Sequence, residues 1–196
     1  MKKIKVKVTF KDEVLGTACA DPDIHREFIA SKAPDAPSME EEVAALGVDA
    51  VVERGTTVFP RGKEGVPILY DYQVRGFFKD TCSALRKVKG TESFKVKAYK
   101  KVIDGLVFVE PREIPLRFDG EVGTCQRPLR AQTAQGERIA LASSETVPEG
   151  TTAEFTVVLL DDDMDALVRE WLDYGEFKGI GQWRNSGKGR FAWEVA

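Results

Sequence analysis

Residues 152–172, TAEFTVVLLDDDMDALVREWL, carry the strongest structural signal in the sequence. Between Thr152 and Leu160 one side of the chain carries Ala153, Phe155, Val157 and Leu159. Apolar residues at every second position predict a strand with one buried face. Asp161 to Asp163 then supply an N-cap and a negative first turn. The apolar residues that follow recur at the spacing of one helix face: Met164, Leu167, Val168, Trp171 and Leu172. The stretch predicts a strand that leads directly into an amphipathic helix, which Gly175 ends.

Two further strands are predicted at the ends of the chain. Residues Lys3 to Phe10 alternate strictly between polar and apolar types, which is typical of a half-buried strand. Arg190 to Val195 predicts a short last strand, directly after a glycine-rich segment.

The middle of the chain predicts a strand, a turn and a helix. Val66 to Arg75 is apolar and aromatic enough for a strand, and Gly76 is expected to break it. Phe77 to Val88 then has helical spacing, and Gly90 ends it.

Two short strands are predicted after this helix. Asp104-Gly105 is a turn signal, and Leu106 to Val109 and Ile114 to Phe118 follow as strands interrupted by prolines.

The order of these elements predicts an α+β protein. Reduced to its core it reads β-α-β-β-α-β, the ferredoxin-like or RRM-like arrangement. We expect a single domain over residues 1–196, with an insertion over approximately 20–60 after the first strand. A projecting hairpin or loop is expected over approximately 119–149, before the last strand-helix-strand unit.

Composition excludes several classes of protein. The chain is 42% hydrophobic and 31% charged, without an apolar run near the ~18 residues that a membrane span needs. The alternating start, Met1 to Lys7, lacks the apolar stretch of a secretory signal. Three scattered cysteines and one histidine predict neither a disulfide framework nor a metal site. We therefore expect a cytoplasmic protein that contacts no membrane and needs no metal or cofactor.

The small net charge of −3 conceals a strong segregation of charge along the chain. Residues 20–53 hold nine acidic and two basic residues, whereas residues 61–101 hold eleven basic and four acidic ones. Phe177 to Arg190 holds four basic residues and no acidic one. Such segregation can build a basic face on a mildly acidic protein.

The segment GIGQWRNSGKGRF, residues 179–191, has two pairs of glycines separated by five residues. Glycines let a backbone approach a ligand closely, and the interspersed cations attract phosphate. The segment is not a P-loop, because Lys188 is followed by Gly189 and then by a predicted strand. It is not a dinucleotide fingerprint either, since that motif opens a helix. The alternative is a glycine-rich connection that only lets the helix and strand pack.

This segment resembles the glycine-rich loop G-h-G-x5-G-x-G of the RAMP superfamily, the ferredoxin-like RNA-binding proteins of CRISPR systems. It also lies in the same place, between the second helix and the last strand. A second segment, VRGFFKDTCSALR over 74–86, is similar to the strand-glycine-helix segment of RAMP backbone subunits, with Gly76, Lys79 and Arg86 in register. Phe77, Phe78 and Asp80 depart from that pattern.

The resemblance implies a non-catalytic protein that binds single-stranded RNA or another single-stranded nucleic acid. It also implies self-association or association with other CRISPR or phage subunits. Cations and an aromatic side chain suit such a ligand, for phosphates and a stacked base respectively. The expected binding residues are Gly179, Gly181, Trp183, Arg184, Gly187, Lys188, Gly189 and Arg190 on the loop, Lys79 and Arg86 on the first helix, and Arg127 on the hairpin.

Two alternatives remain open. In RAMP endoribonucleases, which need no metal, a histidine soon after the first strand serves as general acid or base. His25 stands in that region, and Lys32 could stabilise negative charge. The other alternative is a phage-encoded mimic or inhibitor of a CRISPR complex, because the acidic run Glu40 to Glu42 could dock on a partner's basic face.

Overall fold

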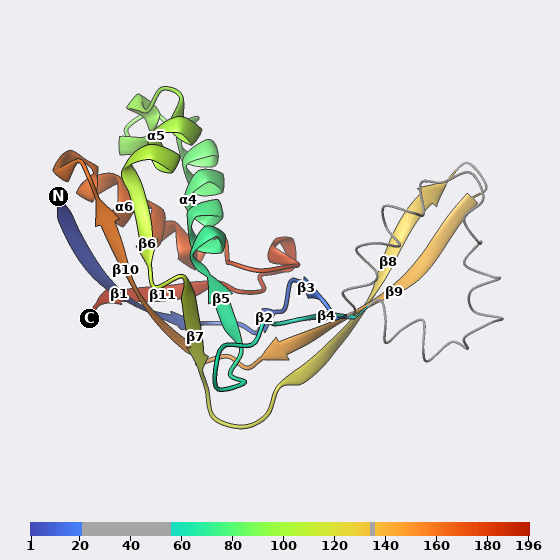
Figure 1. The fold of residues 1–196 in the computed structure, drawn as a ribbon. Coiled ribbons are helices and arrows are strands. Elements are labelled where there is room, and N and C mark those ends of the chain that lie inside the picture. Colours follow the sequence, from blue (N-terminus) through green and yellow to red (C-terminus); the bar gives the residue numbers. More distant parts are fainter. Residues whose placement is uncertain (21–55, 134–135) are drawn as a thin grey trace, which may run out of the picture. The chain divides into compact units, whose positions relative to one another are not determined.

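A computed structural model describes residues 1–20, 56–133 and 136–196, with the backbone alone for 129–133 and 136–141. Two compact units make up the chain. The first consists of Met1–Val14, Pro60–Glu121 and Val147–Ala196, and the second of Leu15–Phe59 and Val122–Thr146. The secondary structure is mixed, so the α+β class expected from the sequence is confirmed (Figure 1). The predicted domain boundaries stay a prediction.

The first unit is built on a six-stranded sheet of antiparallel neighbours. Its order is β11 (Phe191–Val195), β1 (Lys2–Phe10), β10 (Thr152–Leu159), β7 (Glu113–Arg117) and β5 (Ile68–Tyr70). Strand β6 (Val107–Glu110) also pairs with β10. In the β1–β10 register, Val6 lies opposite Phe155, so the apolar faces of the two predicted strands coincide.

Helices cover one face of this sheet and close the core (Figure 1). Helix α4 (Asp71–Leu85) packs beside α6 (Asp165–Asp173), with the Phe78 and Trp171 ring centroids 5.5 Å apart. The Phe77 ring lies 5.2 Å from that of Phe191 on β11. All four of these aromatic side chains are buried. Burial of their large apolar surfaces supplies much of the driving force for packing the helices on the sheet.

The strand-to-helix stretch folds largely as predicted. Asp161 accepts a hydrogen bond from the Asp163 backbone N–H (3.1 Å), and the 3-10 turn η2 (Asp162–Met164) leads into α6. Helix α6 ends at Asp173, however, and the 3-10 turn η3 (Tyr174–Glu176) runs through Gly175. Gly175 is therefore not the residue that ends the helix. A Cβ there would overlap the Phe191 ring, so glycine is required by packing.

The predicted strand, glycine turn and helix over 66–88 is wrong in its boundaries. Strand β5 covers only Ile68–Tyr70, and α4 begins at Asp71 and runs through Gly76 to Leu85. The helix starts there because the Gln73 side chain accepts a hydrogen bond from the Tyr70 backbone N–H (2.7 Å). Val74 is buried on the same helix face as Phe77 and Phe78. Gly76 marks no turn, so its match to the RAMP strand-glycine-helix segment does not hold.

The predicted turn at Asp104-Gly105 is also wrong. Both residues belong to helix α5 (Tyr99–Leu106), which the sequence did not reveal, and β6 begins directly after it. A 3-10 turn, η1 (Glu92–Lys95), lies between α4 and α5. The strand predicted at Ile114 to Phe118 corresponds to β7, and the last predicted strand corresponds to β11.

The second unit holds strands β3 (Ala18–Cys19) and β4 (Thr57–Val58) and the antiparallel pair β8 (Gly123–Thr133) and β9 (Gly136–Val147). Its sheet has the order β2-β9-β4-β3, with β2 spanning Val14–Leu15 and β8 beside β9. Among the described residues, no helix is both long and apolar enough to cross a membrane.

Candidate nucleic-acid interface

The glycine-rich loop lies in the first unit, between η3 and β11, and its two ends pack against each other. The Ile180 backbone N–H donates to the Gly189 carbonyl (3.0 Å). A Cβ at Gly179 would overlap that same carbonyl, and a Cβ at Gly189 would overlap the carbonyl oxygen of Ile180. Gly189 also has a φ of +72°. Backbone packing therefore requires glycine at both positions. This agrees with the alternative in which the glycines only let the connection between helix and strand pack.

The inner part of the loop turns through three residues of positive φ: Gly181 (+97°), Trp183 (+54°) and Gly187 (+89°). Trp183 is unusual among them, because a left-handed backbone costs a residue with a Cβ about 1–2 kcal/mol. The Ser186 hydroxyl donates to the Trp183 carbonyl (3.0 Å) at the start of the 3-10 turn η4 (Arg184–Ser186). The Trp183 side chain is 41% exposed. The strained turn holds a large aromatic ring partly in solvent.

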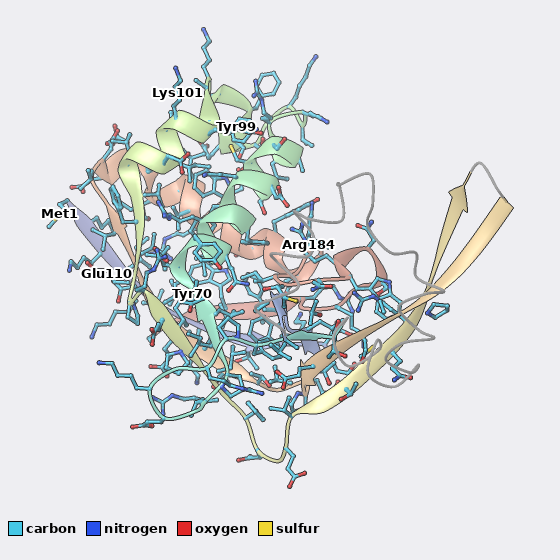
Figure 2. The ribbon with its side chains drawn as sticks, turned by 45° about the vertical axis from the view of Figure 1, so that its right-hand side comes forward. Met1, Tyr70, Tyr99, Lys101, Glu110 and Arg184 are labelled. Carbon is cyan, nitrogen blue, oxygen red and sulfur yellow. The ribbon has the colours of Figure 1, made fainter. Side chains whose placement is uncertain are left out.

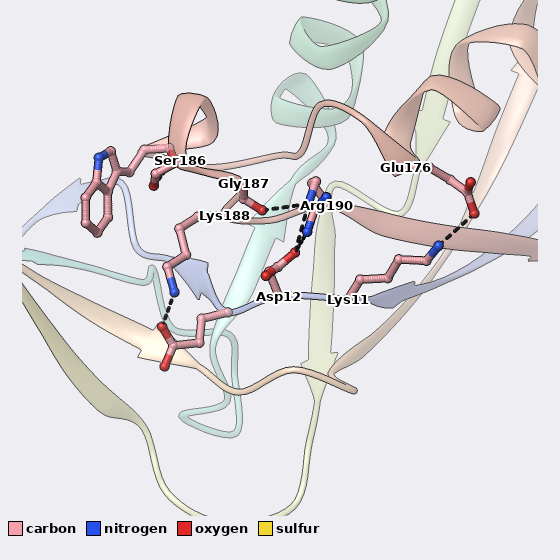
Figure 3. Close-up of polar contacts among 9 residues, drawn as sticks. Lys11, Asp12, Glu176, Ser186, Gly187, Lys188 and Arg190 are labelled. Atoms are coloured by element: carbon pink, nitrogen blue, oxygen red, sulfur yellow. Dashed lines mark hydrogen bonds and ion pairs between the residues drawn. The ribbon is translucent and has the colours of Figure 1, made fainter.

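Two loop cations pair with carboxylates that follow β1 (Figure 3). Arg190 contacts Asp12 through Nε (2.9 Å) and its terminal nitrogen (2.8 Å), and Nε also reaches the Gly187 carbonyl (3.2 Å). The Lys188 Nζ lies 2.6 Å from a Glu13 carboxylate oxygen, and the Gly189 N–H donates to the Glu13 carbonyl (2.9 Å). Both ion pairs are partly exposed. The carboxylates fix these cations and partly neutralise them.

The third loop cation joins the loop to α4. Arg184 contacts Asp80 at 2.7 Å, and Lys178 lies 3.9 Å from the same carboxylate oxygen. Next to Asp80 on the helix, Lys79 pairs with Asp104 of α5 at 2.5 Å. The structure therefore brings Arg184 close to the part of α4 that holds Lys79.

The remaining predicted cations lie in other surroundings. Arg86 follows the end of α4 and is exposed, with its guanidinium 5.3 Å from the centroid of the Tyr99 ring. Arg127 lies on β8 in the second unit, is only 7% exposed, and its terminal nitrogen approaches the Ser144 hydroxyl at 3.3 Å. Burial leaves little of the Arg127 side chain available to a ligand.

Asp12, Glu13 and Asp80 are the site residues that sequence reasoning missed. A signal for the first two was present, because β1 and β11 are antiparallel neighbours with Phe10 opposite Phe191. That register places the residues after Phe10 beside those before Phe191. The Lys11 N–H accordingly donates to the Arg190 carbonyl (2.8 Å).

The residues of the catalytic alternative, His25 and Lys32, lie outside the described residues, as does the acidic run Glu40 to Glu42. Both alternatives stay predictions.

Comparison with known proteins finds similarity in structure but not in sequence. No protein-family model matches the chain, and no curated protein matches it. The fold is similar to that of a chain in the cryo-EM structure of the type III-B Cmr-beta complex bound to cognate target RNA, with a TM-score of 0.53 at 10% identity. That match covers 99% of this chain, which spans 58% of the length of the other. A chain of a type IV-B CRISPR complex is similar over 100% of this chain and 90% of its own, with a TM-score of 0.49 at 12% identity.

The Cmr-beta likeness concerns the fold alone. It is consistent with the α+β fold class expected from the sequence.

Proposed function

We propose that this protein binds single-stranded RNA through the glycine-rich loop and the adjoining part of α4, without cleaving it. In this proposal it is a RAMP-type CRISPR subunit or a phage relative of one. The observation that carries the proposal is the similarity of its fold to a chain of a CRISPR complex bound to target RNA.

The topology of the first unit supports this assignment. Strands β1, β6, β10 and β11, with α4 between the first two and α6 between the last two, follow the order β-α-β-β-α-β. In space their order is β11-β1-β10-β6, with antiparallel neighbours throughout. We assign this set as a ferredoxin-like core, with α5, β5 and β7 as additions.

The loop has the chemistry that an RNA strand requires. The loop carries three cations, Arg184, Lys188 and Arg190, between its two glycine pairs or directly beside them. Trp183 offers an aromatic surface on which a base can stack. Each cation already contacts a carboxylate in a partly exposed ion pair. Such pairs contribute only about 0–1 kcal/mol, so a phosphate can replace the carboxylate at small cost.

The test measures the affinity for a fluorescent single-stranded RNA of 20 nucleotides at several salt concentrations. The variant Arg184→Gln/Lys188→Gln/Arg190→Gln should bind more weakly and lower the slope of log affinity against log salt by about 2, since each phosphate contact on a single strand contributes about 0.7. A hairpin RNA and a single-stranded DNA of equal length show whether the ligand is unpaired and whether it is RNA.

Thermal unfolding of the variant, followed by circular dichroism, verifies that it folds. Unchanged affinity in a folded variant would remove the glycine-rich loop as the binding site.

Assembly is a further part of the proposal. If the protein lines up along a guide strand, its mass measured by light scattering should rise in steps as longer single-stranded RNAs are added. A single protomer on every length of RNA would contradict self-association.

A further inference from the structure

A strongly basic stretch of the described chain lies outside the glycine-rich loop, over residues 86–106. It holds seven basic residues and two acidic ones, a balance of +5. Both acids are engaged: Glu92 with Lys95 at 3.3 Å, and Asp104 with Lys79. Besides Lys95, which pairs with Glu92, five exposed lysines lie in this stretch: Lys87, Lys89, Lys97, Lys100 and Lys101. We call these five residues the lysine patch.

The lysine patch differs from the glycine-rich loop in its electrostatics. Within the described parts of the chain, no acidic side chain pairs with any of the five ammonium groups, whereas Arg184, Lys188 and Arg190 each contact a carboxylate. Uncompensated like charges repel one another and concentrate counterions around them. A polyanion that replaces those counterions releases them, which favours its binding.

An ordered scaffold presents these lysines. The Glu170 carboxylate of α6 accepts hydrogen bonds from the backbone N–H groups of Glu92 (2.7 Å) and Ser93 (3.0 Å) and from the Ser93 hydroxyl. The Trp171 indole N–H donates to the same hydroxyl (2.9 Å), and Ser93 is fully buried. The segment between α4 and α5 is therefore fixed to the core.

The end of α4 is tied to the start of α5 as well. Arg86 lies over the Tyr99 ring, and Figure 2 shows Tyr99 and Lys101 at the same outer end of the two helices. Ala98 precedes α5 with a φ of +49°, one of two described positions where a residue other than glycine has a positive φ. The other is Trp183, in the proposed RNA-binding loop. Backbone strain of this kind gathers at functional sites.

Exposed apolar side chains lie among the lysines. Phe94 is 49% exposed and Val88 50% exposed. Cations mixed with an exposed aromatic ring suit a nucleic-acid strand, whose phosphates and bases need both. An acidic protein surface would need the cations alone.

We infer that the lysine patch is a second phosphate-binding surface, which contacts the sugar–phosphate backbone of a nucleic acid independently of the glycine-rich loop. Lysine ammonium groups act as point charges toward phosphate, so this contact is independent of base sequence.

The test uses Lys97→Gln/Lys100→Gln/Lys101→Gln, with a matched control, Lys3→Gln/Lys5→Gln/Lys63→Gln, that removes the same charge from exposed positions elsewhere. Binding to a 20-nucleotide oligouridylate, an oligothymidylate and a 20-base-pair DNA duplex is measured at several salt concentrations. The patch variant should lose at least about 10-fold in affinity at 0.1 M salt. Its salt slope should fall by about 2 on single strands and by nearly 3 on the duplex. The control should keep its affinity within about two-fold of that of the original protein, with nearly the same salt slope.

The three probes identify the strand, because a loss confined to one of them names the nucleic acid that the patch contacts. Equal slopes for the patch variant and the original protein on every probe would overturn the inference, and so would equal losses in the patch variant and the control. Tighter binding of the original protein to a poly-glutamate peptide than to all three probes would also overturn it, in favour of an acidic protein partner.

The glycine-loop variant separates this inference from the proposed function. If the loop variant loses affinity and the patch variant does not, the proposed function stands and the second surface falls. If only the patch variant loses affinity, the second surface stands and the loop is not the site.

Discussion

Gly179 lies directly against the backbone of Gly189, so closely that a Cβ on either residue would overlap backbone atoms of the other arm of the loop. The two arms are joined there by the hydrogen bond from the Ile180 N–H to the Gly189 carbonyl. Two of the four glycines that suggest a ligand-binding loop are therefore needed to close the loop itself. A ligand would therefore contact the inner residues of the loop and the cations of the loop.

We expect Gly179→Ala and Gly189→Ala to destabilise the protein. Overpacking costs about 1–3 kcal/mol in the free energy of unfolding, and the φ of +72° at Gly189 adds strain to the second variant. Chemical denaturation measures the free energy of unfolding of both variants. Gly76→Ala in α4 is the matched control, because a Cβ there meets nothing within 4 Å. It should raise stability by about 0.5–1 kcal/mol, as glycine disfavours a helix interior by that amount. A Gly179→Ala protein as stable as the original would contradict this reading of the loop.

The sequence predicted the parts of the fold whose periodicity is unambiguous. Strands β1 and β10 and helix α6 follow from regular apolar spacing, which survives packing because the same faces are buried. The predicted helix begins too late. The apolar residues at 68–70 belong to strand β5, and apolar residues of α4 follow from Val74 onward, so the apolar pattern does not mark where the strand ends and the helix begins. Gly76 predicts a turn in the sequence, but a helix position without close neighbours tolerates glycine at a small cost.

Helix α5 and the acidic partners of the site depend on contacts that sequence spacing does not reveal. Helix α5 has only one fully buried residue, Ile103, and it begins after a left-handed alanine. Asp80 reaches Arg184 from 104 positions away in the chain. Local patterns identified the cations of the loop, whereas the carboxylates that hold them became evident only in three dimensions.

The ion pair between Arg184 and Asp80 makes a prediction about RNA affinity. Asp80→Asn removes the carboxylate that competes with phosphate, so RNA should bind more tightly, by roughly two- to five-fold for a pair worth about 0.5–1 kcal/mol. Anisotropy titrations at low salt measure the change. The double variant Asp80→Asn/Arg184→Gln keeps the net charge unchanged and should bind more weakly than Asp80→Asn alone. An affinity that does not change in Asp80→Asn would show that Arg184 contacts no phosphate.

The three cysteines should differ sharply in reactivity. Burial raises the pKa of the Cys82 thiol above its usual value, and its side chain is inaccessible on α4, whereas Cys19 is exposed and Cys125 is partly exposed. In Cys19→Ser/Cys125→Ser, labelling of the remaining thiol with a disulfide reagent at pH 8 should be slower than in unfolded protein by on the order of 100-fold or more, because it requires opening of the core. Rapid labelling of that variant in its native state would show that α4 opens easily.

Asp165 should make the stability of the protein depend on pH in the acid range. Burial opposes ionisation of this carboxyl, but Arg169 (2.9 Å) and Lys2 (3.0 Å) outweigh burial and hold its pKa below the ordinary value of 3.8. Because the pKa is lower in the folded state, the contribution to stability is complete above about pH 4 and is lost as the pH falls through the folded-state pKa.

Asp165→Asn should therefore lower the free energy of unfolding by about 0.2–1 kcal/mol at pH 7, the range for partly exposed ion pairs, and the difference from the original protein should shrink below pH 4. Urea unfolding at pH 3, 4, 5 and 7 measures this difference. Asp119→Asn, at an exposed position without an ion pair among the described residues, serves as the control and should show no such trend. A difference that stays constant from pH 7 to pH 3 would mean that the two cations do not stabilise the ionised carboxylate.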